Sequence, residues 1–303
     1  QALLNTYKHK TNYTISDIVF GLGPKINAAG RIADAGAAVK LLIEEDFHEA
    51  VSFTKVLLER NTERQGLDSN ITKEALEQLN QNKEFKEKAS TVIYGKGWHK
   101  GVIGIVASRL IENHYKPTIV LTENDGIMSG SARSVRGFDI HNAIEQCGDL
   151  VDQFGGHKYA AGLSLKAENY KAFKSKFEDI VKNSIQEELK IPEIAYDTII
   201  DISQIDKKIL RLLKEMEPFG PGNMKPIFRA NKVQDTGFAK VLKEKHLKLS
   251  AKNKTQKLDA IGFGMAYAYP KVAQGKPFDA CFTIEENEFN GQKNIQLNLK
   301  DIK

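Results

Sequence analysis

The stretch Gly97-Trp-His-Lys-Gly-Val-Ile-Gly-Ile-Val-Ala-Ser-Arg-Leu110 decides the fold class of the protein. It opens as a glycine-rich turn and continues as an apolar helix predicted over 102–112. Strands are predicted on either side of it, over 91–94 and 118–122, where β-branched and apolar residues gather. A strand, a tight turn, a helix and a second strand in this order indicate an α/β or α+β domain.

The start of this helix has two interpretations. Free backbone amides at a glycine-rich helix start attract anions. Alternatively, Gly101 and Gly104 only allow the helix to pack closely on the sheet, and His99 is structural, as a lone histidine more often is.

The same pattern continues on both sides of this stretch. Further strands are predicted over 127–132 and 163–165, and further helices over 140–150 and 169–186. Upstream, one helical stripe of apolar residues runs from Phe47 to Asn80, with a polar break at which Gly66 marks a kink or an interruption. A long helix of this kind is typical of a connector between domains.

The last third of the chain has a different character. A short helix over 204–216 leads into Glu217-Pro-Phe-Gly-Pro-Gly-Asn223, where two prolines and two glycines predict a rigid turn. Strands are then expected over 227–239, 247–251, 258–263, 278–285 and 294–299. About five strands in so short a stretch favour a small barrel such as an OB-fold.

Composition limits the class of protein. The 303 residues suggest about two domains, and 41% hydrophobic residues with a mean hydropathy of −0.40 indicate ordinary packed cores. No apolar stretch is long enough to span a bilayer, and no signal peptide is visible. The first residue is Gln1, which we interpret as the start of a fragment. Two distant cysteines, Cys147 and Cys281, favour a reducing cytoplasm and exclude a thiolate metal site.

Charge is unevenly distributed along the chain. Residues 231–303 hold thirteen lysines against eight acidic residues, a net charge of +5, which equals the net charge of the whole chain. The rest of the chain is therefore neutral. An excess of positive charge in one domain predicts a polyanionic partner, although lysines placed only for solubility would give the same count.

Two further motifs combine small residues with an arginine. Gly21-Leu-Gly-Pro-Lys-Ile-Asn-Ala-Ala-Gly-Arg31 ends in a guanidinium suited to phosphate, or is a tight helical packing motif with a surface arginine. Along the strand over 127–132, alternation places Ser129, Ser131 and Arg133 on one face. Two hydroxyls and a guanidinium on one face form a phosphate cradle or merely a polar exposed face.

The last motif is Gln153-Phe-Gly-Gly-His-Lys-Tyr-Ala-Ala-Gly162. Its glycine pair, Gly155 and Gly156, predicts an exposed turn directly before His157. The amides and the imidazole of such a turn can meet a phosphate or a leaving group.

Together these motifs resemble a known family. The stretches 22–31, 97–109, 129–134, 155–162 and 218–223 are similar, in the same order, to motifs of the RecJ exonuclease family, which belongs to the DHH phosphoesterase superfamily. The resemblance covers essentially the whole chain.

The resemblance implies an architecture. Residues 1–46 would be the C-terminal end of the catalytic DHH domain and residues 47–88 a connector helix. Residues 89–190 would form the DHH-associated α/β domain, and residues 191–303 the OB-fold β-barrel.

The resemblance also implies a function, as part of a single-stranded-DNA-specific 5′-to-3′ exonuclease of DNA repair and recombination. Arg31, Ser131 and Arg133, with Gly155 and Gly156, would hold the 5′-phosphate end, and His157 would be catalytic. Lysines and aromatic residues of the barrel would bind the single strand; these are Lys240, Lys243, Lys245 and Lys248, with Phe238 or Phe263. A single-strand-binding protein or a helicase would be further partners, and no membrane is expected.

One departure from the family concerns the metal. Two-metal hydrolysis needs clustered Asp and His ligands, but the family's Asp-His-His triplet and its upstream Asp-x-Asp do not occur in this sequence. Mn or Mg is expected in the full-length enzyme. We predict that this chain binds no catalytic metal and is inactive alone.

Two alternatives remain at this point. One is a DHH-family phosphoesterase that acts on short oligonucleotides or nucleotides, against which the lysine-rich barrel argues. The other is a non-catalytic nucleic-acid-binding module.

Overall fold

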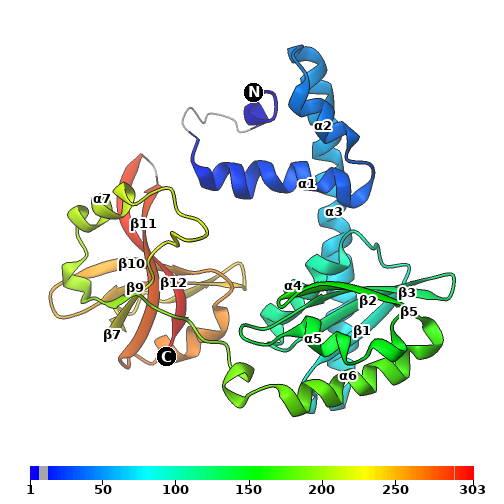
Figure 1. Ribbon diagram of the computed structural model, residues 1–303. Helices are drawn as coiled ribbons and strands as arrows, with labels where there is room; N and C mark the ends of the chain where they lie inside the picture. Colours follow the sequence, from blue (N-terminus) through cyan, green and yellow to red (C-terminus); the bar gives the residue numbers. More distant parts are fainter. Residues whose placement is uncertain (7–12, 290) are drawn as a thin grey trace. The chain divides into compact units, whose positions relative to one another are not determined.

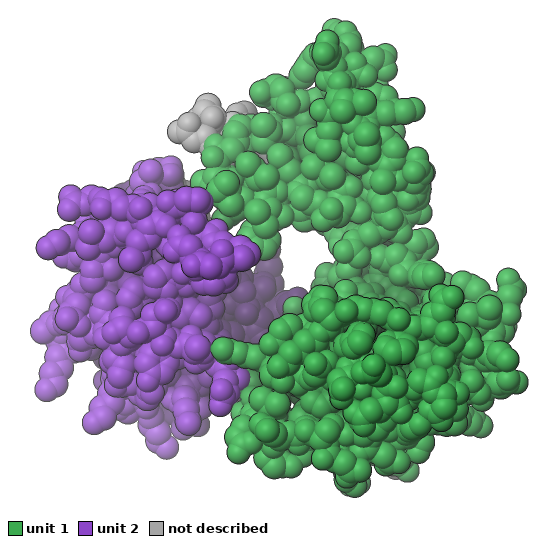
Figure 2. Space-filling model, in the orientation of Figure 1, with its two compact units in different colours: residues 1–192 green, residues 193–303 purple. Residues whose placement is uncertain are grey.

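A computed structural model describes residues 1–6, 13–289 and 291–303 of the chain. The chain forms two compact units, residues 1–192 and residues 193–303 (Figure 2). Within these described ranges, no helix is both long enough and apolar enough to cross a membrane.

The first unit contains a group of helices followed by a five-stranded sheet (Figure 1). Its helices are α1 (Gly23–Ile32), α2 (Gly36–Ile43), α3 (Phe47–Gln81), α4 (Ile103–Asn113), α5 (Ile140–Glu145) and α6 (Tyr170–Ser184). Its strands are β1 (Thr91–Lys96), β2 (Thr118–Asn124), β3 (Ile127–Arg133), β4 (Gln153–His157) and β5 (Ala160–Lys166). The α/β pattern predicted around 97–110 is thus confirmed.

Helix α3 is continuous over 35 residues. The side chain of Asp46 caps it by accepting a hydrogen bond from the Glu49 N–H. Leu57 packs with α1 and α2, whereas Ile71 packs with α4 and the sheet. The interruption considered at Gly66 does not occur, because the roughly 1 kcal/mol cost of one helical glycine is small beside packing at both ends of the helix.

The sheet has the strand order β1-β2-β3-β5-β4, with β1 and β2 parallel and the remaining pairs antiparallel. One face packs against α5 through Ile144 and against α6 through Phe173 and Phe177. The other face is covered by α3 and α4 over β1 and β2. The expectation that Gly155, Gly156 and His157 lie in a turn is wrong, because they pair with β5 as the edge strand β4.

The second unit is a small β-barrel. Its helices are α7 (Lys207–Glu215) and α8 (Tyr269–Val272). Its strands are β6 (Thr198–Ile199), β7 (Phe228–Asp235), β8 (Lys240–Leu242), β9 (His246–Lys252), β10 (Lys257–Gly262), β11 (Phe278–Phe289) and β12 (Gln292–Ile302). Pairing of β7 with both β11 and β9 closes the ring, and β10 runs parallel to β12. Inward side chains such as Leu247, Leu249 and Phe282 fill the interior.

The proline- and glycine-rich segment after α7 is a fixed turn, as predicted. The Nδ2 of Asn223 donates to the carbonyl oxygens of Met216 and Pro218 at 2.9 and 3.0 Å. A pair of backbone hydrogen bonds between Gly220 and Asn223 closes the turn. The segment therefore leads from α7 into β7 along a defined path.

Candidate nucleic-acid interface

Arg31, Ser131 and Arg133 meet beside the first turn of α4. The Nη1 of Arg31 donates to the Gly101 carbonyl oxygen at 3.3 Å. The Nη1 of Arg133 donates to Ser131 Oγ at 3.1 Å and to the Ala132 carbonyl at 2.8 Å. The three side chains come from α1 and β3, which lie about a hundred residues apart in sequence, so the fold assembles what we call the cradle.

Two glycines allow this approach. A Cβ at Gly101 would lie 1.9 Å from the Arg31 carbonyl oxygen, so any side chain there would separate α1 from the loop before α4. A Cβ at Gly104 would lie 2.9 Å from Ser131 Oγ and 3.0 Å from Arg133 Nη2. The predicted close contact of the helix with the sheet is therefore confirmed for Gly104, whereas Gly101 packs against α1 instead. Together the two contacts place the cradle at the start of α4.

The cradle is positively charged without internal compensation. Burial lowers the pKa of the Arg133 guanidinium, and the nearby charge of Arg31 lowers that pKa further. In the part of the chain that the structure describes, neither arginine has an ion-pair partner. Because two like charges held together are stabilised by an anion between them, the cradle is suited to a phosphate.

An open surface of small residues continues from the cradle across the sheet. Ser131 pairs with Gly162, which pairs with Gly155; Arg133 pairs with Ala160, which pairs with His157. Residues in such rows point to one face of the sheet. A Cβ at Gly155 would meet nothing within 4 Å, so this part of the face is uncovered.

His157 lies at the far edge of that surface. It is exposed, and its Nδ1 accepts a hydrogen bond from the Tyr159 N–H at 3.3 Å. Its backbone is about 10 Å from that of Arg133, twice the strand spacing. The adjoining Gly156 has φ +147°, and a Cβ there would lie 2.3 Å from the Ala160 carbonyl oxygen, so only glycine fits.

In the second unit, the lysines predicted to bind DNA lie on β8 and β9 and in the turn between these strands. Lys240 and Lys248 are opposite each other on β8 and β9, on the outer face, because Leu247 and Leu249 point inward. Lys243 and Lys245 lie in the turn between those strands.

Both predicted aromatic residues are exposed. Phe238 is 51% exposed with the Lys240 Nζ 4.9 Å from its ring centre, and Phe263 is 63% exposed beside His246. Both rings are therefore accessible to bases, although Lys240 lies over one face of Phe238.

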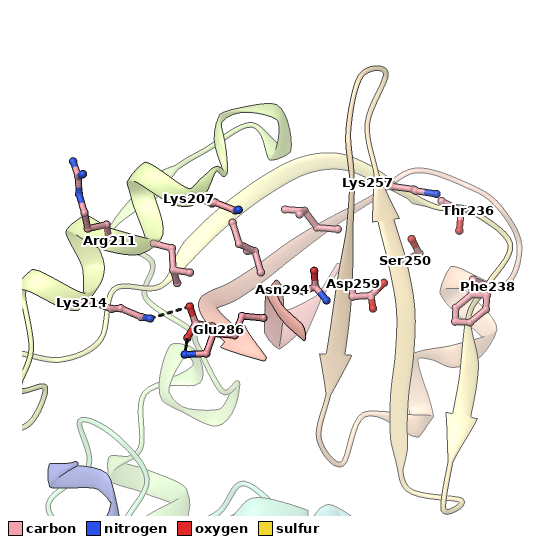
Figure 3. Close-up of a pocket in the computed structure, with 14 residues that line it drawn as sticks. Lys207, Arg211, Lys214, Thr236, Phe238, Ser250, Lys257, Asp259, Glu286 and Asn294 are labelled. Carbon is pink, nitrogen blue, oxygen red and sulfur yellow. Dashed lines mark ion pairs between the residues drawn. The ribbon is translucent and has the colours of Figure 1, made fainter. Parts of the chain in front are cut away.

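The same outer face deepens into a groove that the sequence did not reveal (Figure 3). The groove has a volume of about 910 Å³ and none of the four predicted lysines lines it. Lys207, Arg211 and Lys214 line it from α7, and Phe238 lies at the opposite end. Ser250 and Asp259, opposite each other on β9 and β10, line its floor.

The charges of the groove are partly compensated at one end. Glu286 forms ion pairs with Lys214 at 2.9 Å and Lys293 at 3.5 Å, and these lysines lower the pKa of its carboxyl group. Lys207 and Lys257 have no ion-pair partner among the described residues. In five-stranded OB-folds, oligonucleotides bind across the second and third strands, between the first and the last loop. The groove has this position, between the β7–β9 loop and the β11–β12 hairpin.

No metal site is found in the described residues. Nowhere in residues 1–6, 13–289 and 291–303 do three or more His, Cys, Asp or Glu side chains gather closely enough to hold an ion. The described residues do not fit a catalytic metal pair. His9 falls outside the described residues.

Comparison with known proteins agrees with both units. Residues 87–183 match the DHHA1 domain, and residues 196–301 match the RecJ OB domain. The single-stranded-DNA-specific exonuclease RecJ of Bacillus subtilis is 35% identical over 285 residues, which cover 93% of this chain and 36% of that protein. The chain is similar to the C-terminal region of RecJ.

A second relative and a solved structure extend this finding. RecJ of Salmonella typhimurium is 30% identical over 95% of this chain and 51% of its own length. The crystal structure of Thermus thermophilus RecJ in complex with Mn²⁺ matches with a TM-score of 0.84 and 25% identity, over 99% of this chain and 43% of that one. A second Thermus structure is a complex with Mg²⁺. The chain thus spans about a third to a half of the length of these RecJ proteins, and its barrel is the OB-fold predicted from the sequence.

Sequence reasoning found the cradle but missed its surroundings. The alternation on β5, with Ala161 and Leu163 inward, could have shown that Ala160 and Gly162 face outward beside Ser131 and Arg133. No sequence pattern predicted the groove, because the residues that line it come from six separate segments of the chain.

Proposed function

We propose that this chain is the DNA-binding part of a single-stranded-DNA-specific 5′-to-3′ exonuclease that acts in DNA repair and recombination. The observation that carries the proposal is the cradle: Arg133 donates to Ser131, Arg31 is held at Gly101 close enough to lower the pKa of Arg133, and neither arginine has an ion-pair partner among the described residues. In this proposal the cradle binds the terminal 5′ phosphate, and Gly155, Gly156 and His157 face the nucleotides next to it. The names of the relatives support single-stranded DNA as the substrate.

The outer face of the barrel would bind the single-stranded DNA. Lys240 and Lys248 would contact phosphates and Phe238 would stack on a base, with Lys243 and Lys245 at the hairpin tip adding charge. Binding of this kind is electrostatic and independent of sequence, so it weakens as salt rises.

The whole protein is proposed to hydrolyse phosphodiester bonds with Mn or Mg held by a DHH domain, of which residues 1–46 would be the end. The metal-bound Thermus structures support this part of the proposal. A cytoplasmic location fits two free cysteines. A single-strand-binding protein or a helicase would be further partners.

Fluorescent single-stranded oligonucleotides, with and without a 5′ phosphate, test the proposal by titration at several salt concentrations. The chain should bind the phosphorylated strand more tightly, and log affinity should fall with log salt by about 0.7 per phosphate bound. Arg133→Ala should remove the preference for the 5′ phosphate, whereas Arg136→Ala, which removes an exposed arginine nearby, should keep it.

Each other result has a defined meaning. Binding that ignores the 5′ phosphate would refute the cradle and leave the barrel as the grip. An absence of binding would favour the small-substrate phosphoesterase. Strong, chelator-sensitive degradation of DNA by this chain with Mn²⁺ would refute the prediction that it is inactive alone.

A further inference from the structure

The loop before α4 is held in place from the side of α3. The buried indole of Trp98 donates its N–H to Glu74 Oε2 of α3 at 2.8 Å. The same ring lies directly over Gly95, where a Cβ would come within 2.1 Å of it. The next residue, His99, is therefore presented on a loop whose path is fixed.

The backbone of Gly101 connects His99 with the cradle. Its N–H donates to His99 Nδ1 at 3.1 Å, and its carbonyl oxygen accepts from Arg31 Nη1 at 3.3 Å. The Arg31 backbone also packs directly against Gly101, which is possible because glycine has no side chain. His99 thus acts on the loop segment that receives the Arg31 guanidinium.

This hydrogen bond assigns a state to the imidazole. A ring nitrogen that accepts from a backbone N–H carries no proton, so a neutral His99 has its proton on Nε2. The imidazole thereby holds the Gly101 backbone by an acceptor that an aliphatic or phenyl side chain does not have.

We propose that His99 is a positioning residue that orients the Arg31 guanidinium through Gly101 and so sets the selectivity of the cradle for a terminal phosphate. The role of His99 in orienting Arg31 does not depend on what the chain binds. The effect on phosphate selectivity rests on the function proposed above. His99 need not touch the phosphate for either.

Three variants separate the hydrogen bond from the bulk of the ring. His99→Phe keeps an aromatic ring but has no acceptor, and His99→Ala removes both. His99→Asn places Oδ1 where Nδ1 accepts from Gly101, and so keeps the acceptor on a smaller side chain. Melting temperatures identify the variants that remain folded, and His99→Ala replaces His99→Phe if the phenyl ring does not fit.

The first measurement observes Arg31 directly. In the chain labelled with ¹⁵N-arginine, the guanidinium signal of Arg31, assigned with Arg31→Lys, should show restricted rotation. His99→Phe or His99→Ala should release this restriction, and His99→Asn should retain it. An Arg31 signal that is the same in all variants, or an Asn variant that behaves like the Phe variant, would overturn the proposal.

The second measurement is the ratio of affinities for 5′-phosphorylated and 5′-hydroxyl oligonucleotides. His99→Phe should lower this ratio roughly three- to tenfold, as expected for the loss of one hydrogen bond, and His99→Asn should stay within about twofold of the original. Affinity for the 5′-hydroxyl strand should not change. A ratio unaffected by His99→Phe would refute the role in selectivity.

The two measurements distinguish the two failures. If the unaltered chain shows no preference for the 5′ phosphate, the proposed function fails, and the Arg31 signal still decides whether His99 orients the guanidinium. If the preference exists but no His99 variant changes it or the Arg31 signal, only the positioning role fails.

Discussion

Replacing Gly104 by alanine should damage the cradle while leaving the fold almost unchanged. The new methyl group would lie 2.9 Å from Ser131 Oγ and 3.0 Å from Arg133 Nη2. Both are the ends of side chains, which can move aside, and no backbone atom lies as close. The methyl group would therefore displace the guanidinium rather than the helix.

The magnitudes follow from these distances. Alanine inside a helix is more favourable than glycine by about 1 kcal/mol, and this gain offsets much of the roughly 1 kcal/mol or more that crowding costs. The free energy of unfolding should thus change by less than about 1 kcal/mol. A weakened charge-assisted hydrogen bond from Arg133 to a phosphate costs about 1.4 kcal/mol or more, which is roughly tenfold in affinity.

Urea denaturation and titration with 5′-phosphorylated and 5′-hydroxyl oligonucleotides measure the two effects separately. Gly101→Ala is the contrasting variant, since its methyl group meets the Arg31 backbone at 1.9 Å and should lower stability by about 1–3 kcal/mol. If Gly104→Ala keeps the full preference for the phosphorylated strand, the placement of the phosphate between Ser131 and Arg133 is refuted.

Other predictions concern the rest of the chain. Gly66→Ala should raise the free energy of unfolding by about 0.5–1 kcal/mol, because no atom lies within 4 Å of the new methyl group; a decrease in urea denaturation would contradict this. Lys207→Glu combined with Lys257→Glu should lower the salt slope of single-strand binding by about 0.7 for each DNA phosphate that the variant no longer binds, and an unchanged slope would exclude the groove. Burial raises the pKa of Cys147 to about 11, so iodoacetamide should modify the less buried Cys281 first at pH 8, as mass spectrometry would show. Since an unfolded thiol has a pKa near 8.5, the unfolded state binds fewer protons above that pH. Stability should then fall from about pH 8.5 towards 11, less so in Cys147→Ala.

The elements that sequence patterns predicted are those with a clear apolar period. Val106 and Leu110 mark the buried stripe of α4, and Leu247 and Leu249 mark the inward face of β9. The predictions of secondary structure that were wrong concern segments with glycine. Gly155 and Gly156 indicated a turn because neither has a side chain to show alternation, whereas strand β4 exists through its hydrogen bonds to β5.

The sequence indicated which residues form the cradle, but it did not indicate that they lie close together in the fold. Alternation along β3 placed Ser131 and Arg133 on one face, and the glycine-rich motif singled out Arg31. That these residues meet depends on the contact of Gly101, just before α4, with α1 and on the contact of Gly104, in α4, with β3. No local sequence pattern predicts these tertiary contacts. The link from His99 to Arg31 is of the same kind, because it depends on backbone atoms of Gly101 whose direction only the folded loop defines.

The unbroken course of α3 has a consequence for the time course of binding. One end of this continuous helix packs against α2 and against α1, which carries Arg31, and the other end packs against α4 and the sheet that carries Arg133. Both arginines are therefore in place before DNA binds. Little conformational entropy remains to be lost when the phosphate enters. We therefore expect stopped-flow mixing to give one exponential phase whose rate rises linearly with DNA concentration, without the plateau that a slow rearrangement would impose.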